Sequence, residues 1–224
     1  MNLIVINRPH FFPLGPDYQT AKRLVDLILC FLALPFIIPV SLLCALAIFL
    51  ESGRPVFFIQ ERIGRGGRPF WIYKFRTMNA NIDNSMGRSF MKAYVRGEID
   101  QEVAGNGTFK PKIEQQINRV GRFLRRTSLD ELPQLINVLK GEMSIVGPRP
   151  NVPWEVDEYR PWHYERLEVL PGITGLAQVN GRSGINFDTI VRYDINYIEH
   201  QNLVTDLKII FQTVNSVIHS KGAG

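Results

Sequence analysis

The sequence of 224 residues has little cysteine and little histidine. Its two cysteines, Cys30 and Cys44, both lie inside one apolar run, which argues against a disulfide framework. The four histidines are scattered and show no spacing typical of zinc ligands: His10, His163, His200 and His219. These absences exclude a small disulfide-stapled domain and give a zinc centre no starting point.

Charge of either sign is missing from Leu27 to Leu50, where no Asp, Glu, Lys, Arg or His occurs. The whole chain is formally +5, but by direct count residues 1–50 carry about +1, residues 51–150 about +7 and residues 151–224 about −3. A hydrophobic content of 45% excludes a disordered or collagen-like chain. Because basic and acidic residues are interleaved in the middle of the chain, no nucleic-acid partner is expected.

The run from Leu27 to Leu50 is long enough to cross a membrane, with roughly 36 Å of helix against a hydrocarbon core of roughly 30 Å. Pro35 and Pro39 argue against a simple span. Neither proline has an N–H, so two carbonyls lose their helical partners where lipid offers no replacement. If the first helix begins at Arg23 and breaks near Pro39, neither half can cross alone. The pattern therefore favours a helix–break–helix hairpin over a continuous span.

Positive charges flank this hairpin on both sides. Lys22 and Arg23 precede it, and four arginines follow it: Arg54, Arg62, Arg65 and Arg68. By the positive-inside rule both flanks prefer the cytoplasmic side. The predicted organisation is an N-terminal lead (1–20), a re-entrant membrane segment in one leaflet (21–52) and a cytoplasmic domain (53–224).

The cytoplasmic domain is predicted to be α+β, helix-rich and compact, with one small β-hairpin. Residues 55–60 and 69–76 are rich in β-branched and aromatic residues, and a glycine-rich turn at 64–67 separates them. Residues from about 79 to 116 form a polar, irregular or partly helical excursion. A last amphipathic helix opens at Leu203. Its apolar stripe, taken alone, favours the core, and the alternative is an interfacial helix on a membrane surface.

Two adjacent acids open a predicted helix in the middle of the chain. Ser128 and Glu131 form a capping-box pattern, and Pro133 is tolerable only near a helix start, which places Asp130 and Glu131 in the first turn. One interpretation is that these acids only complement the helix dipole, and the local pattern alone favours it. The other is that the exposed N–H groups keep a carboxylate ionised and help to gather phosphates.

Three basic residues are candidate phosphate ligands. Prolines on both sides of Arg149 fix its backbone in an extended form, which makes a rigid mount for a guanidinium. Lys74 and Arg76 fall on one face of a predicted strand. For each residue the alternative is an ordinary solvated surface position.

A glycine-rich block follows near the end of the domain. Pro171-Gly172-Ile173-Thr174-Gly175 leads to Gln178, Asn180 and Arg182. Glycine lets a backbone approach a ligand closely, and these three side chains supply hydrogen-bond donors, so we consider them candidate substrate ligands. The alternative is two successive turns in a loop-rich region.

Together these segments resemble the monotopic phosphoglycosyl transferases, also called bacterial sugar transferases, in their small, minimal form. The resemblance covers roughly residues 20–220. It rests on five pieces: Lys22-Arg23 with Asp26 before the proline-containing helix, Tyr73 to Met78, Ser128 to Pro150, Pro171 to Arg182, and Asp206-Leu207-Lys208.

The resemblance implies an enzyme that moves a sugar phosphate from a UDP-sugar to a polyprenol phosphate such as undecaprenyl phosphate, with Mg²⁺, and releases UMP. It implies that Asp130 is the nucleophile and forms a covalent phospho-sugar intermediate, and that Glu131 binds the metal. Charge on the transferring phosphoryl group needs cations besides the metal. The residues that would supply them are Arg125, Arg149 and Lys74 or Arg76.

The resemblance also implies a location at the cytoplasmic face of a bacterial inner membrane, in contact with lipid headgroups. There the enzyme would catalyse the first membrane step of a glycoconjugate pathway such as exopolysaccharide or O-antigen synthesis. Arg23, Pro35 and Pro39 belong to its membrane hairpin. The sugar and the oligomeric state stay open, with a homo-oligomer as one option. Two other classes remain as alternatives: a membrane-bound phosphodiester or nucleotide hydrolase, and a scaffold whose basic middle binds anionic headgroups.

Overall fold

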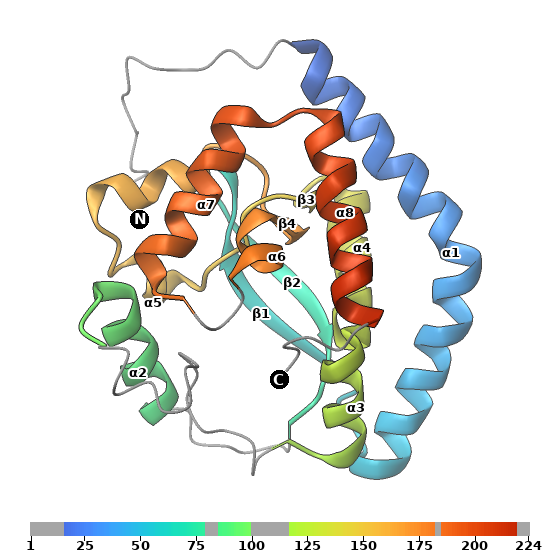
Figure 1. Ribbon diagram of the computed structural model, residues 1–224. Helices are drawn as coiled ribbons and strands as arrows, with labels where there is room; N and C mark the ends of the chain where they lie inside the picture. Colours follow the sequence, from blue (N-terminus) through green and yellow to red (C-terminus); the bar gives the residue numbers. More distant parts are fainter. Residues whose placement is uncertain (1–15, 79–84, 100–116, 182–184, 219–224) are drawn as a thin grey trace.

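The structure, a computed structural model, describes residues 16–78, 85–99, 117–181 and 185–218. Its first element is α1 (Pro16–Ser52), a helix of 37 residues. Figure 1 shows α1 lying along one side of a domain that is made of shorter helices and strands. The predicted N-terminal lead and most of the predicted excursion lie outside the described residues.

Both prolines of the apolar segment lie inside α1, and the backbone stays helical through them. The structure thus has one bent helix where the sequence predicted two helices separated by a break near Pro39; the bend is visible as an arc in Figure 1. A proline removes one hydrogen bond and crowds the preceding turn, which bends a helix without ending it when neighbouring turns keep their bonds. By length and composition α1 could cross a membrane.

The predicted β-hairpin is confirmed as β1 (Phe57–Ile63) and β2 (Pro69–Phe75), joined by the 3-10 turn η1 (Arg65–Gly67). The strands are antiparallel, with Phe70 opposite Arg62 and Phe58 opposite Lys74. Because cross-strand partners and alternate residues share a face, Arg62 and Lys74 lie on the same face of the hairpin.

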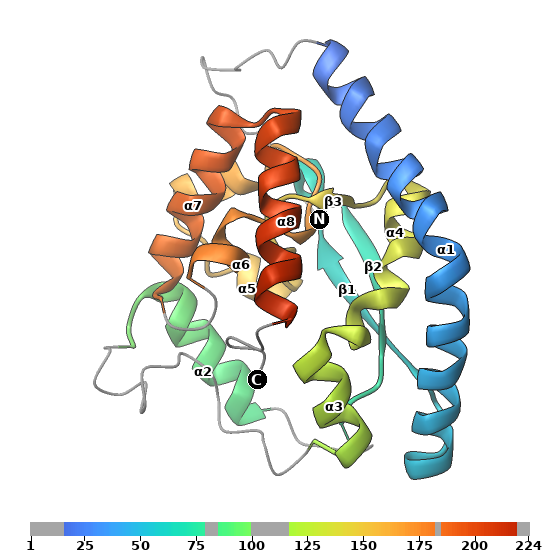
Figure 2. The same ribbon diagram turned by 45° about the vertical axis from the view of Figure 1, so that its right-hand side comes forward.

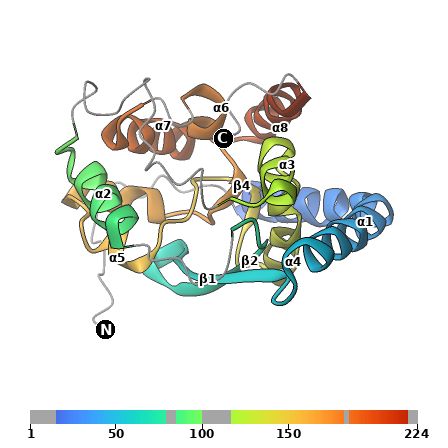
Figure 3. The same ribbon diagram turned by 90° about the horizontal axis from the view of Figure 1, so that it is seen from below.

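The remaining elements are mostly short helices. In chain order they are α2 (Ser85–Arg96), α3 (Arg119–Thr127), η3 (Leu129–Gln134), α4 (Leu135–Lys140), β3 (Ser144–Val146), α5 (Pro153–Val156), η4 (Pro161–Leu167), β4 (Gly172–Thr174), α6 (Leu176–Asn180), α7 (Phe187–His200) and α8 (Leu203–Ile218). Strands β3 and β4 pair in parallel. In Figure 3 the β1–β2 ribbon lies on one side of the domain, α6, α7 and α8 lie on the other, and α1 runs along the edge.

Helix α1 packs against the domain at two separate places. Cys30 is buried in a cluster with Phe70 of the hairpin. Further along, Cys44 and Ile48 pack with Phe75 in a second cluster. Both cysteines are free thiols. Burying a side chain such as Ile48 stabilises the packed state by about 1.5–3 kcal/mol, so each contact point holds part of the helix against the domain.

The outward faces of α1 and α8 are apolar. Within α8, Ile209 is buried, whereas Leu207, Phe211 and Val214 are exposed by 56%, 74% and 52%. Half of the apolar stripe predicted for this helix therefore faces outward, while its other members, Leu203, Ile210 and Val217, are half-buried. Figure 2 shows α8 at the front of the domain with α1 at the right edge. Exposed apolar stripes of this kind are typical of surfaces that contact a partner or a membrane.

Candidate active site

The two adjacent acids lie in the turn between α3 and α4. Ser128 ends α3 in the left-handed conformation, with φ of 57°, and the 3-10 turn η3 that follows contains Asp130 and Glu131. The predicted capping box is absent, because the Ser128 side chain caps no N–H and its own N–H is bonded to the Arg125 carbonyl at 3.2 Å. A left-handed residue serves as the C-cap of the preceding helix, whereas an N-cap needs an extended backbone.

Glu131 is held by two cations from different parts of the chain. Its Oε1 accepts a hydrogen bond from Lys74 Nζ on β2 at 2.8 Å and one from an Arg149 guanidinium nitrogen at 2.9 Å. Burial by itself would raise the pKa of Glu131, but the charges of Arg149 and Lys74 outweigh it and hold the pKa well below its usual range. Glu131 is therefore ionised at neutral pH.

Asp130, the neighbouring acid, forms no hydrogen bond or ion pair within the described part of the chain. Burial raises the pKa of its carboxyl, and the negative charge of Glu131 raises it further. The charges of Lys74, Arg149 and Arg125 act in the opposite direction without reversing the shift. The site thus contains an unpaired carboxyl with three cations around it, which is an arrangement suited to a nucleophile that attacks a phosphate.

Arg125 completes this group from the end of α3. Its Nε donates to Thr77 Oγ1 at 2.9 Å, just beyond the end of β2. The Asp130 charge favours the charged form of Arg125, although burial lowers the pKa of the guanidinium. The structure therefore brings together five of the predicted residues: Asp130, Glu131, Lys74, Arg125 and Arg149.

Arg62 is a neighbour of the site that the sequence pattern did not single out for this role. It shares the hairpin face with Lys74, and its guanidinium donates to the Pro150 carbonyl at 3.0 Å and to Gln60 Oε1 at 2.7 Å. Burial lowers the pKa of Arg62 to about 10. Strand alternation hints at this position, but the register that brings it beside the loop of Arg149 cannot be read from the sequence.

Two other predicted basic residues bind the ends of helices. The buried Arg76 guanidinium donates to the Ser52 carbonyl at the end of α1, at 2.6 Å. The Arg23 guanidinium donates to the carbonyls of Val138 and Leu139 near the end of α4. Positive groups at helix C-termini are favourable because they satisfy free carbonyls. The structure does not bring Arg76 into the group around Asp130.

The glycine-rich block lets two segments of the chain approach closely. A Cβ on Gly172 would lie 2.1 Å from the Gly147 nitrogen, and one on Gly147 would lie 2.4 Å from the Leu170 carbonyl oxygen. Gly175 is equally confined, with 2.3 Å from such a Cβ to the Gly147 oxygen. These glycines therefore permit the contact between β3 and β4, an approach of backbone to backbone.

Gln178 and Asn180 lie on α6, which follows this block. Both polar atoms of the Gln178 amide are buried without a partner among the described residues. Asn180 is exposed and borders an open hollow of about 450 Å³ between α6 and α7. The hollow is lined by Leu176, Asn180, Thr189, Arg192, Tyr193 and Asn196. Arg182 lies outside the described residues, and the substrate role of all three stays a prediction.

The donor set around the acids fits a magnesium ion. No group of three or more His, Cys, Asp or Glu side chains that could hold a metal occurs in the described ranges. Mg²⁺, however, is usually bound by one or two carboxylates together with waters and substrate phosphates. Both cations that contact Glu131 do so at Oε1. Glu131 Oε2 and the unpaired Asp130 carboxyl therefore remain as oxygen ligands for a magnesium ion, and substrate phosphate oxygens would supply further ligands.

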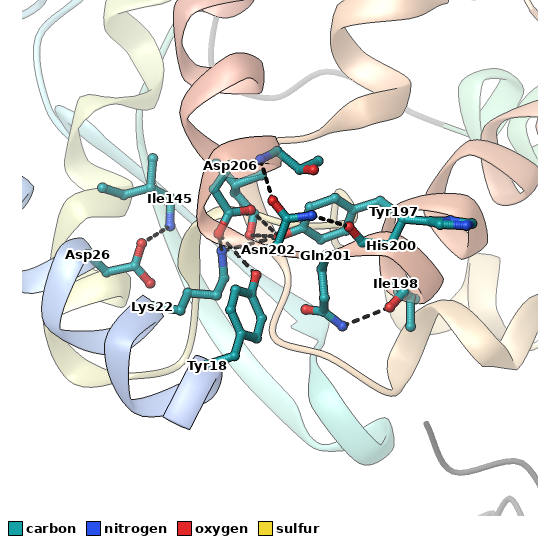
Figure 4. Close-up of polar contacts among 12 residues, drawn as sticks. Tyr18, Lys22, Asp26, Ile145, Tyr197, Ile198, His200, Gln201, Asn202 and Asp206 are labelled. Atoms are coloured by element: carbon teal, nitrogen blue, oxygen red, sulfur yellow. Dashed lines mark hydrogen bonds and ion pairs between the residues drawn. The ribbon is translucent and has the colours of Figure 1, made fainter. Parts of the chain in front are cut away.

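A second polar cluster fixes the first turns of α1 (Figure 4). The Asp206 carboxylate accepts hydrogen bonds from Lys22 Nζ at 2.8 Å, from the Tyr18 hydroxyl at 3.0 Å and from the Tyr197 hydroxyl at 2.6 Å. Asp26 accepts from a backbone N–H of β3 at 3.1 Å. The start of α1 is thus tied to α7, α8 and β3, while its end is tied to Arg76.

Similarity to known proteins extends over most of the chain. The family model described as bacterial sugar transferase matches residues 17–220. The chain is 36% identical over 220 residues to the exopolysaccharide production protein ExoY of Rhizobium meliloti, covering 96% of this chain and 95% of that protein. It is 40% identical over 223 residues to the UDP-glucose:undecaprenyl-phosphate glucose-1-phosphate transferase of Caulobacter vibrioides, covering 94% and 76%.

Other relatives are longer than this chain. An uncharacterised sugar transferase of Haemophilus influenzae is 39% identical over 202 residues, which cover 90% of this chain and 42% of that protein. The chain therefore spans less than half the length of some curated relatives. The match over nearly all of its own length shows that the chain belongs to the bacterial sugar transferase family.

Proposed function

We propose that this protein transfers a sugar 1-phosphate from a UDP-sugar to undecaprenyl phosphate or a similar polyprenol phosphate and releases UMP. The observation that carries the proposal is the unpaired Asp130 carboxyl surrounded by Lys74, Arg125 and Arg149. Family membership and the activity named for the Caulobacter relative support the same reaction class. A cluster of cations beside a free carboxylate suits an anionic diphosphate substrate.

In the first step an Asp130 oxygen attacks the phosphorus that carries the sugar. A bond forms between this oxygen and phosphorus, the bond from phosphorus to the bridging oxygen breaks, and UMP leaves with that oxygen. Arg149 and Lys74 lie where they can leave Glu131 and bind the diphosphate oxygens, since all three share one contact point. Fixed cations stabilise the charge that develops on the phosphoryl oxygens.

In the second step an oxygen of the polyprenol phosphate attacks the same phosphorus. The bond from Asp130 to phosphorus breaks, the carboxylate is restored and a polyprenyl diphosphate sugar leaves. Because the phospho-sugar is stored on Asp130 between the steps, the soluble and lipid substrates need not be bound together. Two successive displacements at one cluster need only one set of cations.

Magnesium fits this reaction as a bound cofactor. Glu131 Oε2 and Asp130 are the residues that would hold it, together with substrate phosphate oxygens. When bound, it supplies positive charge to the phosphoryl oxygens. Lys74 and Arg149 keep Glu131 ionised, which preserves a metal-binding oxygen across the neutral pH range.

The same proposal places α1 in one leaflet at the cytoplasmic face of a bacterial inner membrane. Support comes from the contacts at both ends of α1. Lys22 and Arg23 near its start and Ser52 at its end all contact the same domain. A helix whose two ends bind one domain cannot leave those ends on opposite sides of a bilayer unless one set of contacts breaks. The exposed apolar residues of α8 would then lie in the same interface.

The test is release of UMP from a panel of UDP-sugars by the purified protein in nanodiscs, with and without undecaprenyl phosphate. We expect up to one equivalent of UMP per active enzyme without lipid, continuous release with it, and a phospho-sugar mass on the peptide that contains Asp130. Asp130→Asn should abolish both the release and the label. The exposed Asp157 provides the matched control, so Asp157→Asn should retain both.

Three outcomes would contradict the proposal. Label retained by Asp130→Asn would remove Asp130 as the nucleophile. UMP release that turns over without lipid, with free sugar phosphate as product, would indicate a hydrolase. Lack of activity with every UDP-sugar, in a protein that binds membranes through its basic residues, would favour the scaffold alternative.

A further inference from the structure

Two arginines, the buried Arg166 and the half-buried Arg62, bind the backbone of the loop that carries Arg149. Four consecutive carbonyls, from Pro148 to Asn151, all accept hydrogen bonds. Backbone N–H groups of Gly172 and Ile63 bind the outer two, each at 2.9 Å. Guanidinium groups bind the inner two. Arg166 donates to the Arg149 carbonyl at 3.0 Å, and Arg62 donates to the Pro150 carbonyl at 3.0 Å.

This arrangement follows from the sequence of the loop. The prolines at 148 and 150 have no N–H, so the loop cannot be fixed by the reciprocal backbone bonds of a regular strand. Buried carbonyls still need donors, because an unsatisfied one costs about 1–3 kcal/mol. Side chains from outside the loop therefore supply the donors at its centre, where Arg149 lies.

Arg166 is itself fixed on every side. Its side chain is 2% exposed and lies 2.6 Å from the Asp194 carboxylate, which is also 2% exposed. A second guanidinium nitrogen donates to Asn151 Oδ1 and, at 3.1 Å, to the Tyr159 hydroxyl. A buried guanidinium with a paired carboxylate and several acceptors has one orientation, so it can hold the Arg149 carbonyl in one place.

The Arg149 side chain needs such support. The side chain as a whole is 49% exposed, and its ion-pair partner within the described residues is Glu131. A long exposed side chain with a single partner is positioned mainly by its backbone. We propose that Arg166, paired with Asp194, and Arg62 are positioning residues that fix the Arg149 backbone and so bring its guanidinium to the acids. This inference rests on the proposed transferase function.

The test is a double-mutant cycle scored by UMP release. Arg166→Lys keeps the charge but loses the forked donors, and we expect kcat/KM for the UDP-sugar to fall about 10- to 100-fold, as expected when a reacting group is displaced by about 1 Å. The kcat/KM of the Arg149→Lys variant should fall by a similar factor. Because both act on one guanidinium, adding Arg166→Lys to Arg149→Lys should reduce kcat/KM by less than about 2-fold.

A second readout separates positioning from mere stability. Without lipid, the amplitude of UMP release counts active enzyme, so a displaced Arg149 guanidinium should slow this release and leave its amplitude unchanged. The matched control is Arg160→Lys. Arg160 also binds an aspartate of α7, Asp188, and the carbonyl of another arginine, Arg96, and neither partner belongs to the loop of Arg149. This variant should leave both the rate of UMP release without lipid and kcat/KM unchanged.

Additive effects in the double mutant, or a lowered amplitude of UMP release at an unchanged rate in Arg166→Lys, would overturn the inference. If Arg166→Lys does not fold, the same cycle with Arg62→Lys decides, with the same two expected results. Absence of UMP release by the wild-type protein would refute the proposed function, whereas an active wild type with a fully active, folded Arg166→Lys variant would refute only the positioning role.

Discussion

Lys22 on α1 and Asp206 on α8 form an ion pair of 2.8 Å across 184 positions of sequence. Their side chains are only 14% and 6% exposed. The tyrosines at 18 and 197 donate to the same carboxylate (Figure 4). The pair joins the apolar helix to the domain at its first turns, on the side of the fold where α7 ends and α8 begins.

Removing Lys22 should weaken this junction strongly. Lys22→Met leaves the Asp206 charge largely buried without its cation, and breaking such a pair costs about 3–5 kcal/mol. We expect the melting temperature of the protein in nanodiscs to fall by roughly 6–20 °C, at about 2–4 °C per kcal/mol for a chain of this size. Lys92→Met is the control, since Lys92 is 41% exposed in its pair with Glu158 and should cost less than about 1 kcal/mol.

A second variant separates charge from packing. Lys22→Met combined with Asp206→Leu removes both charges and should recover part of the loss, because replacing a buried pair with apolar groups is often neutral. If Lys22→Met and Lys92→Met shift the melting temperature equally, the pair does not hold α1 to the domain.

The acid limb of the pH–activity profile should report the ionisation of Asp130. A nucleophilic carboxylate must be deprotonated, so kcat/KM should rise with pH through its pKa. Burial and Glu131 raise that pKa, and the Lys74 charge lowers it. Lys74→Gln should therefore move the acid limb to higher pH, besides reducing the rate. Lys92→Gln, which is remote from the site, should leave the limb in place. A shift of the Lys74→Gln limb to lower pH would contradict this electrostatic arrangement.

Local sequence patterns predicted the elements of the fold well and their contacts poorly. The hairpin and the helix from Leu203 follow from strand alternation and helical periodicity. The capping box at Ser128 failed because the same Ser-x-x-Glu spacing also fits a residue that ends one helix and precedes a 3-10 turn. The prediction of a helix break near Pro39 was wrong, because the chain remains helical through Pro35 and Pro39.

The site was predictable in its residue types but not in its pairings. Local chemistry made the proline-flanked Arg149 and the adjacent acids candidates, although the local pattern of the acids alone favoured a helix-dipole role. The partners of Arg76 could not be predicted. Lys74 and Arg76 share one face in the sequence pattern, but Lys74 lies within β2 and binds Glu131, whereas Arg76 follows the last residue of β2 and binds the end of α1. Arg62 and Arg166 act through loop carbonyls, and no side-chain pattern marks which carbonyls are left without backbone donors.

The contacts at both ends of α1 predict a one-leaflet topology. We would introduce single cysteines at the exposed positions Asp17 and Arg54, in a variant with Cys30→Ala and Cys44→Ala. An impermeant maleimide should label both positions in inside-out membrane vesicles and neither in intact spheroplasts. A cysteine in the exposed Asp157 position reports the side of the domain. Labelling of Asp17→Cys and Arg54→Cys from opposite sides would show that α1 spans the bilayer.

Gly172 should tolerate no side chain without a backbone shift. A Cβ there would lie 2.1 Å from the Gly147 nitrogen and 2.4 Å from the Thr174 oxygen, and both are backbone atoms that cannot rotate away. Gly172→Ala must therefore separate β3 from β4, and we expect a loss of about 3 kcal/mol or more, at the upper end for overpacking. Gly66→Ala is the control. Gly66 has φ of +67° and no atom within 4 Å of an added Cβ, so only backbone strain of about 1–2 kcal/mol applies. Thermal unfolding of both variants tests whether Gly172→Ala loses more stability than Gly66→Ala. A smaller loss of stability for Gly172→Ala would mean that β3 and β4 can separate at little cost.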